Sequence, residues 1–159
     1  MNQILEREIN DTKQELLKIK GWIDNNKMDS KVSYLNAYSV IKASGTIEQV
    51  LKNILFDKLS DNISEEAKNY LSKHILESSY NPSTGQIQKL LQDINSNWWS
   101  SLDKMIAKNK IHKSNLNSLV QLRNAFSHGN SINESIDVII SYYESGIEII
   151  KYLNEVINK

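Results

Sequence analysis

Apolar residues recur every three or four positions along most of the chain, the spacing that places side chains on one face of an α-helix. We expect a first helix over about residues 2–25, a turn at NNKMDS and a long second helix over about 30–59. Gly45 lies inside the second helix, where glycine costs about 1 kcal/mol relative to alanine, so we expect it to mark the close approach of another backbone. The expected apolar stripes are Ile4, Leu5, Ile9, Leu16, Ile19 and Ile23 on the first helix, and Ala37, Val40, Ile47, Leu51, Ile54 and Leu55 on the second.

Capping signals mark two further helices in the middle of the chain. A third helix should begin near Ser64, where Glu65 and Glu66 suit the positive end of the helix dipole. The segment YNPSTG is the clearest break in the pattern, and Ser83 with Gln86 forms a capping box that opens a fourth helix. The middle of the chain is therefore helical on both sides of this break.

Helical spacing continues to the end of the chain. The segment NSNWWSSLDKMIAKN predicts another short helix, and KNKIHK predicts a loop that leads into the next one. Ser131 and Glu134 form a second capping box, which predicts a final helix from there to about residue 158. Its expected apolar stripe is Ile136, Ile140, Tyr143, Ile147, Ile150 and Ile157.

The pattern therefore predicts an all-α fold, an up-and-down bundle of about five to seven helices that forms a single domain over residues 1–159. No apolar run approaches the roughly 18 residues that span a bilayer, and the N-terminus lacks the apolar stretch of a signal peptide. The chain has no cysteine, so a cytoplasmic location is expected. Met1 and the capped final helix suggest a complete chain.

Composition directs attention to one arginine. The chain has 17 lysines but only 2 arginines. Where lysine supplies almost all of the positive charge, an arginine is more often present because its planar fork of donors is needed. On a helical wheel Arg123 lies about 40° from Leu119, inside the apolar arc that Leu119 forms with Leu122 and Phe126. A guanidinium cannot lose its charge, so on such a face it needs a carboxylate, a cleft or a partner subunit.

A histidine follows Arg123 at the end of the same predicted helix. Gly129 is a natural residue to end this helix, which places His128 in its last turn. Asn124 lies one turn before His128, so its side chain can hydrogen-bond the imidazole and fix its tautomer. Within one helix Arg123 and His128 point about 140° apart, with about 7.5 Å of rise between them. A site that uses both therefore requires either that His128 has left helical geometry or that the site is completed across a two-fold axis between two copies, and we favour the second.

The second predicted helix offers a carboxylate partner for Arg123. Glu48 lies beside the apolar stripe that contains Ile47 and Leu51, so it too needs a partner of opposite charge. Pairing Glu48 with Arg123 meets both needs. A structural ion pair beside a helix-terminal histidine would leave the same pattern, and spacing alone does not separate these two interpretations.

Net charge is +0, so any binding of nucleic acid must use a local patch of positive charge. The segment KMIAKNKIHK supplies a candidate, which is either a phosphate-binding surface or an ordinary solvated face. His74 is expected to be structural, and the pair Trp98–Trp99 is expected at the boundary of the core. The basic residues of this candidate surface are Lys104, Lys108, Lys110, His112 and Lys113.

The segment LVQLRNAFSHG, between two helices near the end of an all-α domain, resembles the signature of HEPN domains: an arginine, a polar residue, a short gap and a histidine. The upstream segments AYSVIKASGTIEQVLKNIL and NPSTGQIQKLL, the latter followed by a tryptophan-bearing segment, are similar to the RiboL-PSP subgroup. The resemblance covers about residues 30–155. Arg123 and His128 match the ends of the motif and Asn124 its polar position, while Glu48 corresponds to an acidic position of some members.

The resemblance implies a homodimer that brings two Arg/His sets to one cleft, with RNA as the substrate. Many such domains are endoribonucleases that use neither a metal nor another cofactor. They act in toxin–antitoxin, phage-defence or RNA-processing systems, so an antitoxin or another neighbouring-gene protein is a further expected partner. Some HEPN toxins carry a modified tyrosine two residues after the histidine; here that position is Asn130, so this form of control is not expected.

The residue types suit metal-independent RNA cleavage. His128 can act as general acid or base, and Arg123 can bind phosphate oxygens with two N–H groups. Asn124 would orient, and Glu48 would hold Arg123 or assist proton transfer. The products would be a 2′,3′-cyclic phosphate and a 5′-hydroxyl. Two alternatives remain: a non-catalytic HEPN module that binds RNA, nucleotide or protein, and a purely structural interaction domain.

Overall fold

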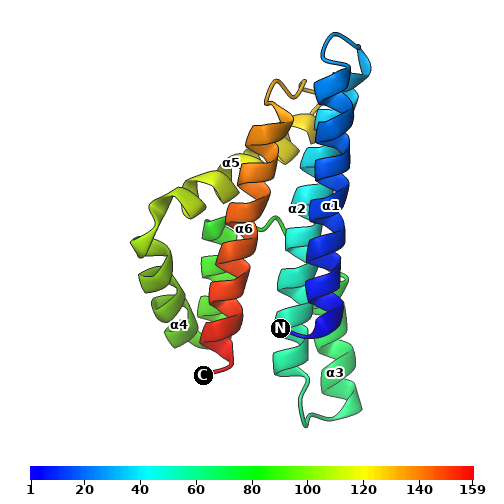
Figure 1. Cartoon of the computed structure of the whole chain (residues 1–159). Coiled ribbons are helices and arrows are strands. Elements are labelled where there is room, and N and C mark those ends of the chain that lie inside the picture. Colours follow the sequence, from blue (N-terminus) through cyan, green and yellow to red (C-terminus); the bar gives the residue numbers. More distant parts are fainter.

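The computed structural model describes all 159 residues and contains six α-helices, one π-helical turn and no β-strand. Figure 1 shows α1 and α2 as a long antiparallel pair, with α6 beside them and both chain ends toward the same end of the bundle. The predicted all-α bundle is confirmed. The elements are α1 (Gln3–Asn25), α2 (Lys31–Leu59), α3 (Glu65–Leu71), η1 (Ser72–Leu76), α4 (Thr84–Lys108), α5 (Lys110–Ser127) and α6 (Ile136–Ile157).

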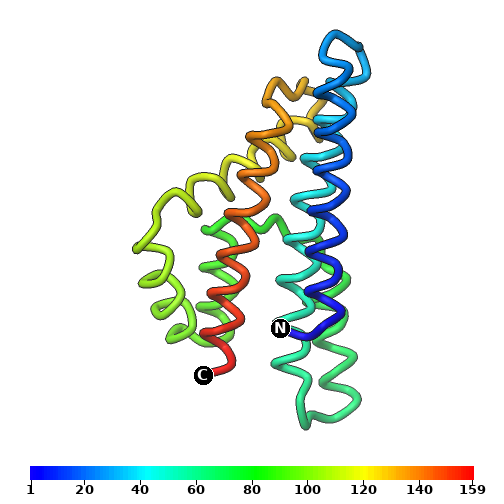
Figure 2. The backbone as a smooth tube through the Cα atoms, in the orientation of Figure 1, coloured from blue at the N-terminus to red at the C-terminus, as the bar shows by residue number.

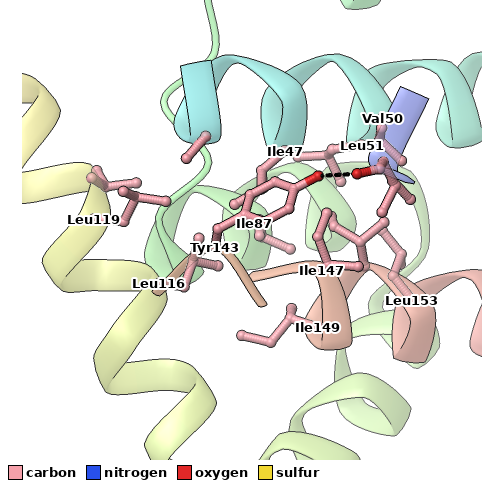
Figure 3. Close-up of a cluster of buried hydrophobic side chains, with 14 of the residues drawn as sticks. Ile47, Val50, Leu51, Ile87, Leu116, Leu119, Tyr143, Ile147, Ile149 and Leu153 are labelled. Atoms are coloured by element: carbon pink, nitrogen blue, oxygen red, sulfur yellow. Dashed lines mark hydrogen bonds between the residues drawn. The ribbon is translucent and has the colours of Figure 1, made fainter. Parts of the chain in front are cut away.

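The core forms where α6 packs against α1, α2, α4 and α5. Side chains from four of these helices interdigitate around Tyr143 of α6 (Figure 3), among them Ile47 of α2, Ile87 of α4 and Leu116 of α5. Each fully buried Leu or Ile side chain contributes about 1.5–3 kcal/mol relative to an exposed one. All six apolar residues predicted for the stripe of α2 are buried, whereas Ile4 of α1 is 77% exposed.

Two glycines differ in their surroundings. A Cβ atom added at Gly45 would meet nothing within 4 Å, so the expected close approach at that position is wrong. A Cβ atom added at Gly146 of α6 would instead clash with Cδ1 of Ile47 and lie 3.2 Å from Cδ1 of Leu116. The tight crossing is therefore set by a glycine of α6 rather than by that of α2.

Helix boundaries follow the predicted caps in two of three cases. As predicted, α3 begins after Ser64 and α4 after Ser83, and each serine hydroxyl accepts a hydrogen bond from the amide of the third residue along. The capping box of Ser131 and Glu134 is wrong, because α6 begins after Ser135, whose hydroxyl accepts from the Val138 amide. Tertiary contacts explain the later start of α6. Ile132 is buried in the core and Asn36 donates to the Glu134 carbonyl, so this segment is held outside the helix.

The segment of the two adjacent tryptophans belongs to α4 but lies beyond a break in it. Asn95 has non-helical backbone angles, φ −160° and ψ 104°, and its side chain accepts from the Asn97 amide as a cap does. Figure 2 shows the sharp change of direction within α4, between its green and yellow-green parts. The predicted separate helix is thus the second half of α4. The predicted KNKIHK loop shrinks to one residue, Asn109, between α4 and α5.

None of the helices has the combination of length and apolar character that crossing a lipid bilayer requires.

Alkaline pH should weaken the fold through Tyr143. Burial raises the pKa of the Tyr143 phenol above its usual value, and its hydroxyl donates to the Ile9 carbonyl at 2.9 Å (Figure 3). The unfolded chain loses this proton near pH 10 while the folded chain keeps it. The contribution of Tyr143 to stability is therefore complete below about pH 10 and falls as the pH rises toward the folded-state pKa.

The measurement is urea denaturation of the wild type and of Tyr143→Phe at several pH values on both sides of 10. The advantage of the wild type in unfolding free energy should shrink above about pH 10, since only the wild type carries this titrating group. An advantage that stays constant with pH would contradict the burial of the phenol.

Candidate functional site

The predicted pairing of Arg123 with Glu48 is confirmed. Arg123 lies in the last two turns of α5, where α5 passes α2, and its Nη2 is 3.6 Å from Oε2 of Glu48. The side chain of Glu48 is 11% exposed, whereas that of Arg123 is 27% exposed. The carboxylate is thus held inside the protein and the guanidinium lies at the boundary with solvent.

Glu48 has two closer partners on its other oxygen. Oε1 lies 2.7 Å from Nζ of Lys52, one turn further along α2, and accepts a hydrogen bond from the Tyr80 amide at 2.7 Å. Lys52 is itself buried, with a side chain 8% exposed, and also donates to the carbonyls of Leu76 and Ser78. We name Glu48, Lys52, the Tyr80 amide and Arg123 the Glu48 cluster.

The Arg123 guanidinium makes no hydrogen bond within the chain. Its distance of 3.6 Å to Glu48 is an ion-pair distance but too long for a hydrogen bond. A guanidinium carries five N–H donors. The donors that face solvent are therefore available to an anion that reaches the exposed part of the side chain.

His128 occupies the position at which α5 ends. Gly129 has φ +85°, and its amide donates to the Phe126 carbonyl, while the Asn130 amide donates to the Ala125 carbonyl. These two hydrogen bonds form a Schellman cap, as the prediction of Gly129 at the helix end required. His128 is the C-cap residue, with φ −96° and ψ 14°, and its side chain is exposed.

Asn124 does not hydrogen-bond His128, so this prediction is wrong. Its Oδ1 accepts instead from Nδ2 of Asn81 at 2.9 Å. Asn81 lies in the segment between η1 and α4, which helical periodicity could not place beside α5. Oδ1 of Asn81 is buried and has no hydrogen-bond partner. Asn124 therefore links α5 to this segment rather than orienting the imidazole.

The loop residue that binds Glu48 is itself firmly packed. The Tyr80 side chain packs against the core, and its hydroxyl donates to the Gln86 carbonyl at 3.1 Å. Burial, and then the charge of Asp93, raises the pKa of the Tyr80 phenol above its usual value. The phenol thus stays protonated as a donor, which helps to hold the Tyr80 amide on Glu48.

The four lysines of the predicted basic surface lie around the junction of α4 and α5. All four side chains are exposed and none is in an ion pair, so their charge is open to solvent. Arg123 is 13 residues beyond the start of α5, about 20 Å along the helix. The structure thus separates this surface from the Glu48 cluster. The four residues are Lys104, Lys108, Lys110 and Lys113.

The remaining predicted side chains have structural surroundings. His112 is half-buried, with Nε2 3.0 Å from the side-chain nitrogen Nδ2 of Asn109 and its ring edge-on to Tyr152. His74 is exposed and stacks on Tyr70 at 4.1 Å between ring centroids. Trp98 and Trp99 pack against the core from its boundary, as expected. None of these side chains forms a hydrogen bond or ion pair with the Glu48 cluster.

A cavity of about 790 Å³ opens between α1 and α6, and neither Arg123 nor His128 lines it. Acidic side chains such as Glu6, Glu144 and Glu148 line it together with Lys13 and Lys151. No three side chains among His, Asp and Glu come together in a geometry that could hold a metal ion. The candidate site therefore consists of the Glu48 cluster and the exposed end of α5.

The sequence analysis did not predict three members of the site, Lys52, Tyr80 and Asn81. Lys52 carried a usable signal, because it lies four residues after Glu48, the spacing of an ion pair on one helix face. Tyr80 contributes a backbone amide, and Asn81 acts from an irregular segment, so no pattern of residue types reveals either of them.

A six-helix bundle that places an arginine and a histidine at the end of one helix, beside a buried acid from a second, is the arrangement expected of a HEPN domain. The chain matches the model of the RiboL-PSP-HEPN family over residues 5–159. Since the match spans almost the whole chain, the protein belongs to the RiboL-PSP-HEPN family. The match also includes α1 from Leu5 onward, whereas the expected range of about 30–155 left out the whole of this helix. Curated proteins and solved structures gave no match.

Proposed function

We propose that the protein is a metal-independent endoribonuclease, in which Arg123 binds the scissile phosphate and His128 transfers a proton. The observation that carries the proposal is the state of Arg123: a permanent cation at the boundary with solvent, held within ion-pair distance of Glu48 but without a hydrogen bond to any group of the chain. Such a guanidinium suits two phosphate oxygens at once. His128 is exposed at the end of the same helix, five residues after Arg123.

The reaction follows from these groups. A base removes the proton of the 2′-hydroxyl, and the 2′-oxygen attacks phosphorus, forming a new P–O bond. The bond to the 5′-oxygen breaks, and an acid protonates that oxygen as it leaves. Arg123 stabilises the extra negative charge on the phosphorane. The products are a 2′,3′-cyclic phosphate and a 5′-hydroxyl.

Two acid–base groups are needed, and one chain offers a single histidine near Arg123. A homodimer with a two-fold axis would bring a second His128 to the same substrate. The exposed lysines at the junction of α4 and α5 would bind phosphates of the flanking RNA. We assign retention of Arg123 to Glu48, and to Asn124 the hydrogen bond that ties the end of α5 to the segment before α4.

A toxin–antitoxin, phage-defence or RNA-processing role in the cytoplasm accords with this activity. An antitoxin or another neighbouring-gene protein would then restrain it.

One observation favours a second candidate, a HEPN module that binds RNA without cleaving it. The His128 imidazole has no hydrogen-bond partner that fixes its orientation, whereas an efficient general base is usually held by a third group. Binding through Arg123 requires no such partner.

Cleavage of RNA in the presence of EDTA, with identification of the new ends, tests the proposal. We expect fragments whose 5′ ends accept phosphate from a polynucleotide kinase without prior dephosphorylation, because they carry a 5′-hydroxyl. The 3′ ends should resist polyadenylation until the cyclic phosphate is removed. Ends with a 5′-phosphate would contradict the mechanism. Binding without cleavage over a mixed panel of RNAs would support the non-catalytic module, and absence of both would leave a structural domain.

A further inference from the structure

We propose that Lys52 is a positioning residue of this site: it holds the buried Glu48 carboxylate, so that the Arg123 guanidinium keeps its charge and its donors for a phosphate group. The inference rests on the proposed function in taking phosphate as the ligand of Arg123.

The distances assign Glu48 to Lys52 rather than to Arg123. Nζ of Lys52 is 2.7 Å from Oε1, whereas the nearest guanidinium nitrogen of Arg123 is 3.6 Å from Oε2. Oε1 also accepts from the Tyr80 amide at 2.7 Å, so both short contacts of the carboxylate are on the side away from Arg123. Arg123 therefore feels the charge of Glu48 without being bound by it.

A count of charges shows what Lys52 adds. The Glu48 cluster contains two cations and one carboxylate, which leaves one positive charge, and the more exposed cation is Arg123. Without Lys52, Glu48 and Arg123 would neutralise each other. The guanidinium fork binds a carboxylate with two parallel hydrogen bonds, so it would then turn toward Glu48 and its donors would be occupied.

Lys52 also fixes the segment that supplies the second donor to Glu48. Its ammonium has three N–H donors, and the carbonyls of Leu76 and Ser78 accept the two that Glu48 does not use. Leu76 is the last residue of η1, and Ser78 lies two residues before Tyr80. One buried lysine therefore holds both the carboxylate and the backbone that binds it.

Stability alone does not require a lysine at this position. An apolar pair of similar volume is often as stabilising as a buried ion pair, because the ion pair must offset the loss of hydration of both charges. Lys52 and Glu48 are both buried within one face of α2, where Met and Gln would fill a similar space. A neutral replacement of the pair therefore separates the role in phosphate binding from the role in folding.

The guanidinium signals of ¹⁵N-labelled protein provide a direct readout. The chain has two arginines, and the other, Arg7, is exposed on α1, so Arg7→Lys assigns the Nε–Hε signal of Arg123. Inorganic phosphate is titrated into the wild type, Lys52→Met, Lys52→Arg and the double variant Glu48→Gln/Lys52→Met. RNA cleavage is measured on the same four proteins.

In the wild type we expect phosphate to shift the Arg123 signal. Lys52→Met should weaken this response roughly tenfold, the effect of removing one unit charge from the neighbourhood. Lys52→Arg should keep the response, and the double variant should recover it, because Arg123 then has no carboxylate to neutralise it. Lys52→Met should likewise cleave RNA more slowly than the wild type, whereas Lys52→Arg should keep the wild-type rate. If Lys52→Met does not fold, Lys52→Gln takes its place, since its amide still donates to backbone carbonyls without carrying charge.

Several results would overturn the inference. One is an unchanged phosphate response in the folded Lys52→Met or Lys52→Gln variant. Another is a phosphate response that is weakened equally in Lys52→Met and in Glu48→Gln/Lys52→Met, which would show that Lys52 has a structural role only. A wild-type Arg123 signal that ignores phosphate would also overturn it. A wild type that responds to phosphate but cleaves no RNA would refute the nuclease and leave the role of Lys52 supported.

Discussion

Replacing His128 with alanine should lower the rate of RNA cleavage by about 10²–10⁴-fold, the usual contribution of a positioned general acid or base. His128 lies at the exposed C-cap of α5 and its side chain makes no hydrogen bond that the fold needs. Its removal should therefore leave the unfolding free energy, the oligomeric state and the affinity for RNA nearly unchanged. Single-turnover cleavage and RNA binding, measured on the same preparation, separate the chemical step from association.

His74→Ala is the matched control for this experiment. His74 is also an exposed histidine, but its ring stacks on Tyr70 of α3 and forms no hydrogen bond or ion pair with the Glu48 cluster. We expect its variant to cleave RNA at the wild-type rate. Equal activity of His128→Ala and the wild type would exclude His128 from the chemistry.

Replacing Glu48 with alanine should lower the free energy of unfolding by about 3–5 kcal/mol, the usual cost of removing one partner of a buried ion pair. The variant leaves the buried ammonium of Lys52 without its carboxylate and the Tyr80 amide without its acceptor. Chemical denaturation followed by circular dichroism measures the loss.

Arg123→Ala supplies the comparison for Glu48→Ala. Arg123 is more exposed, lies 3.6 Å from the carboxylate and forms no hydrogen bond with it, so its removal should cost no more than about 1 kcal/mol. A large loss for both variants would mean that Arg123 is a structural partner of Glu48, against the proposed role in phosphate binding. A small loss for both would mean that the cluster is hydrated rather than buried.

Helical periodicity was enough to predict the fold and one tertiary contact of the site. Glu48 and Arg123 each lie beside or within an apolar stripe, and a charged side chain in that position must find a partner inside the protein. Two stripes that face each other in a bundle bring such residues together. The pairing could therefore be inferred from the sequence without knowing how the helices cross.

Contacts made by irregular segments could not be predicted in the same way. Asn81 takes the hydrogen bond that was expected between Asn124 and His128, because the segment before α4 passes beside α5. Likewise Ser131 and Ser135 both suit a helix start, and the choice depends on the burial of Ile132. The choice between alternative hydrogen-bond partners or helix starts depends on three-dimensional packing. The local sequence does not contain this information.

The position of Glu48 depends, through Gly146, on α6, a helix that contributes no polar group to the site. Because that residue has no side chain, α6 rests directly on Ile47, the neighbour of Glu48 in α2. Any change in the spacing of these two helices is transmitted along one peptide unit to the carboxylate. A substitution at this crossing would thus displace the Glu48 carboxylate while every side chain of the Glu48 cluster stays the same.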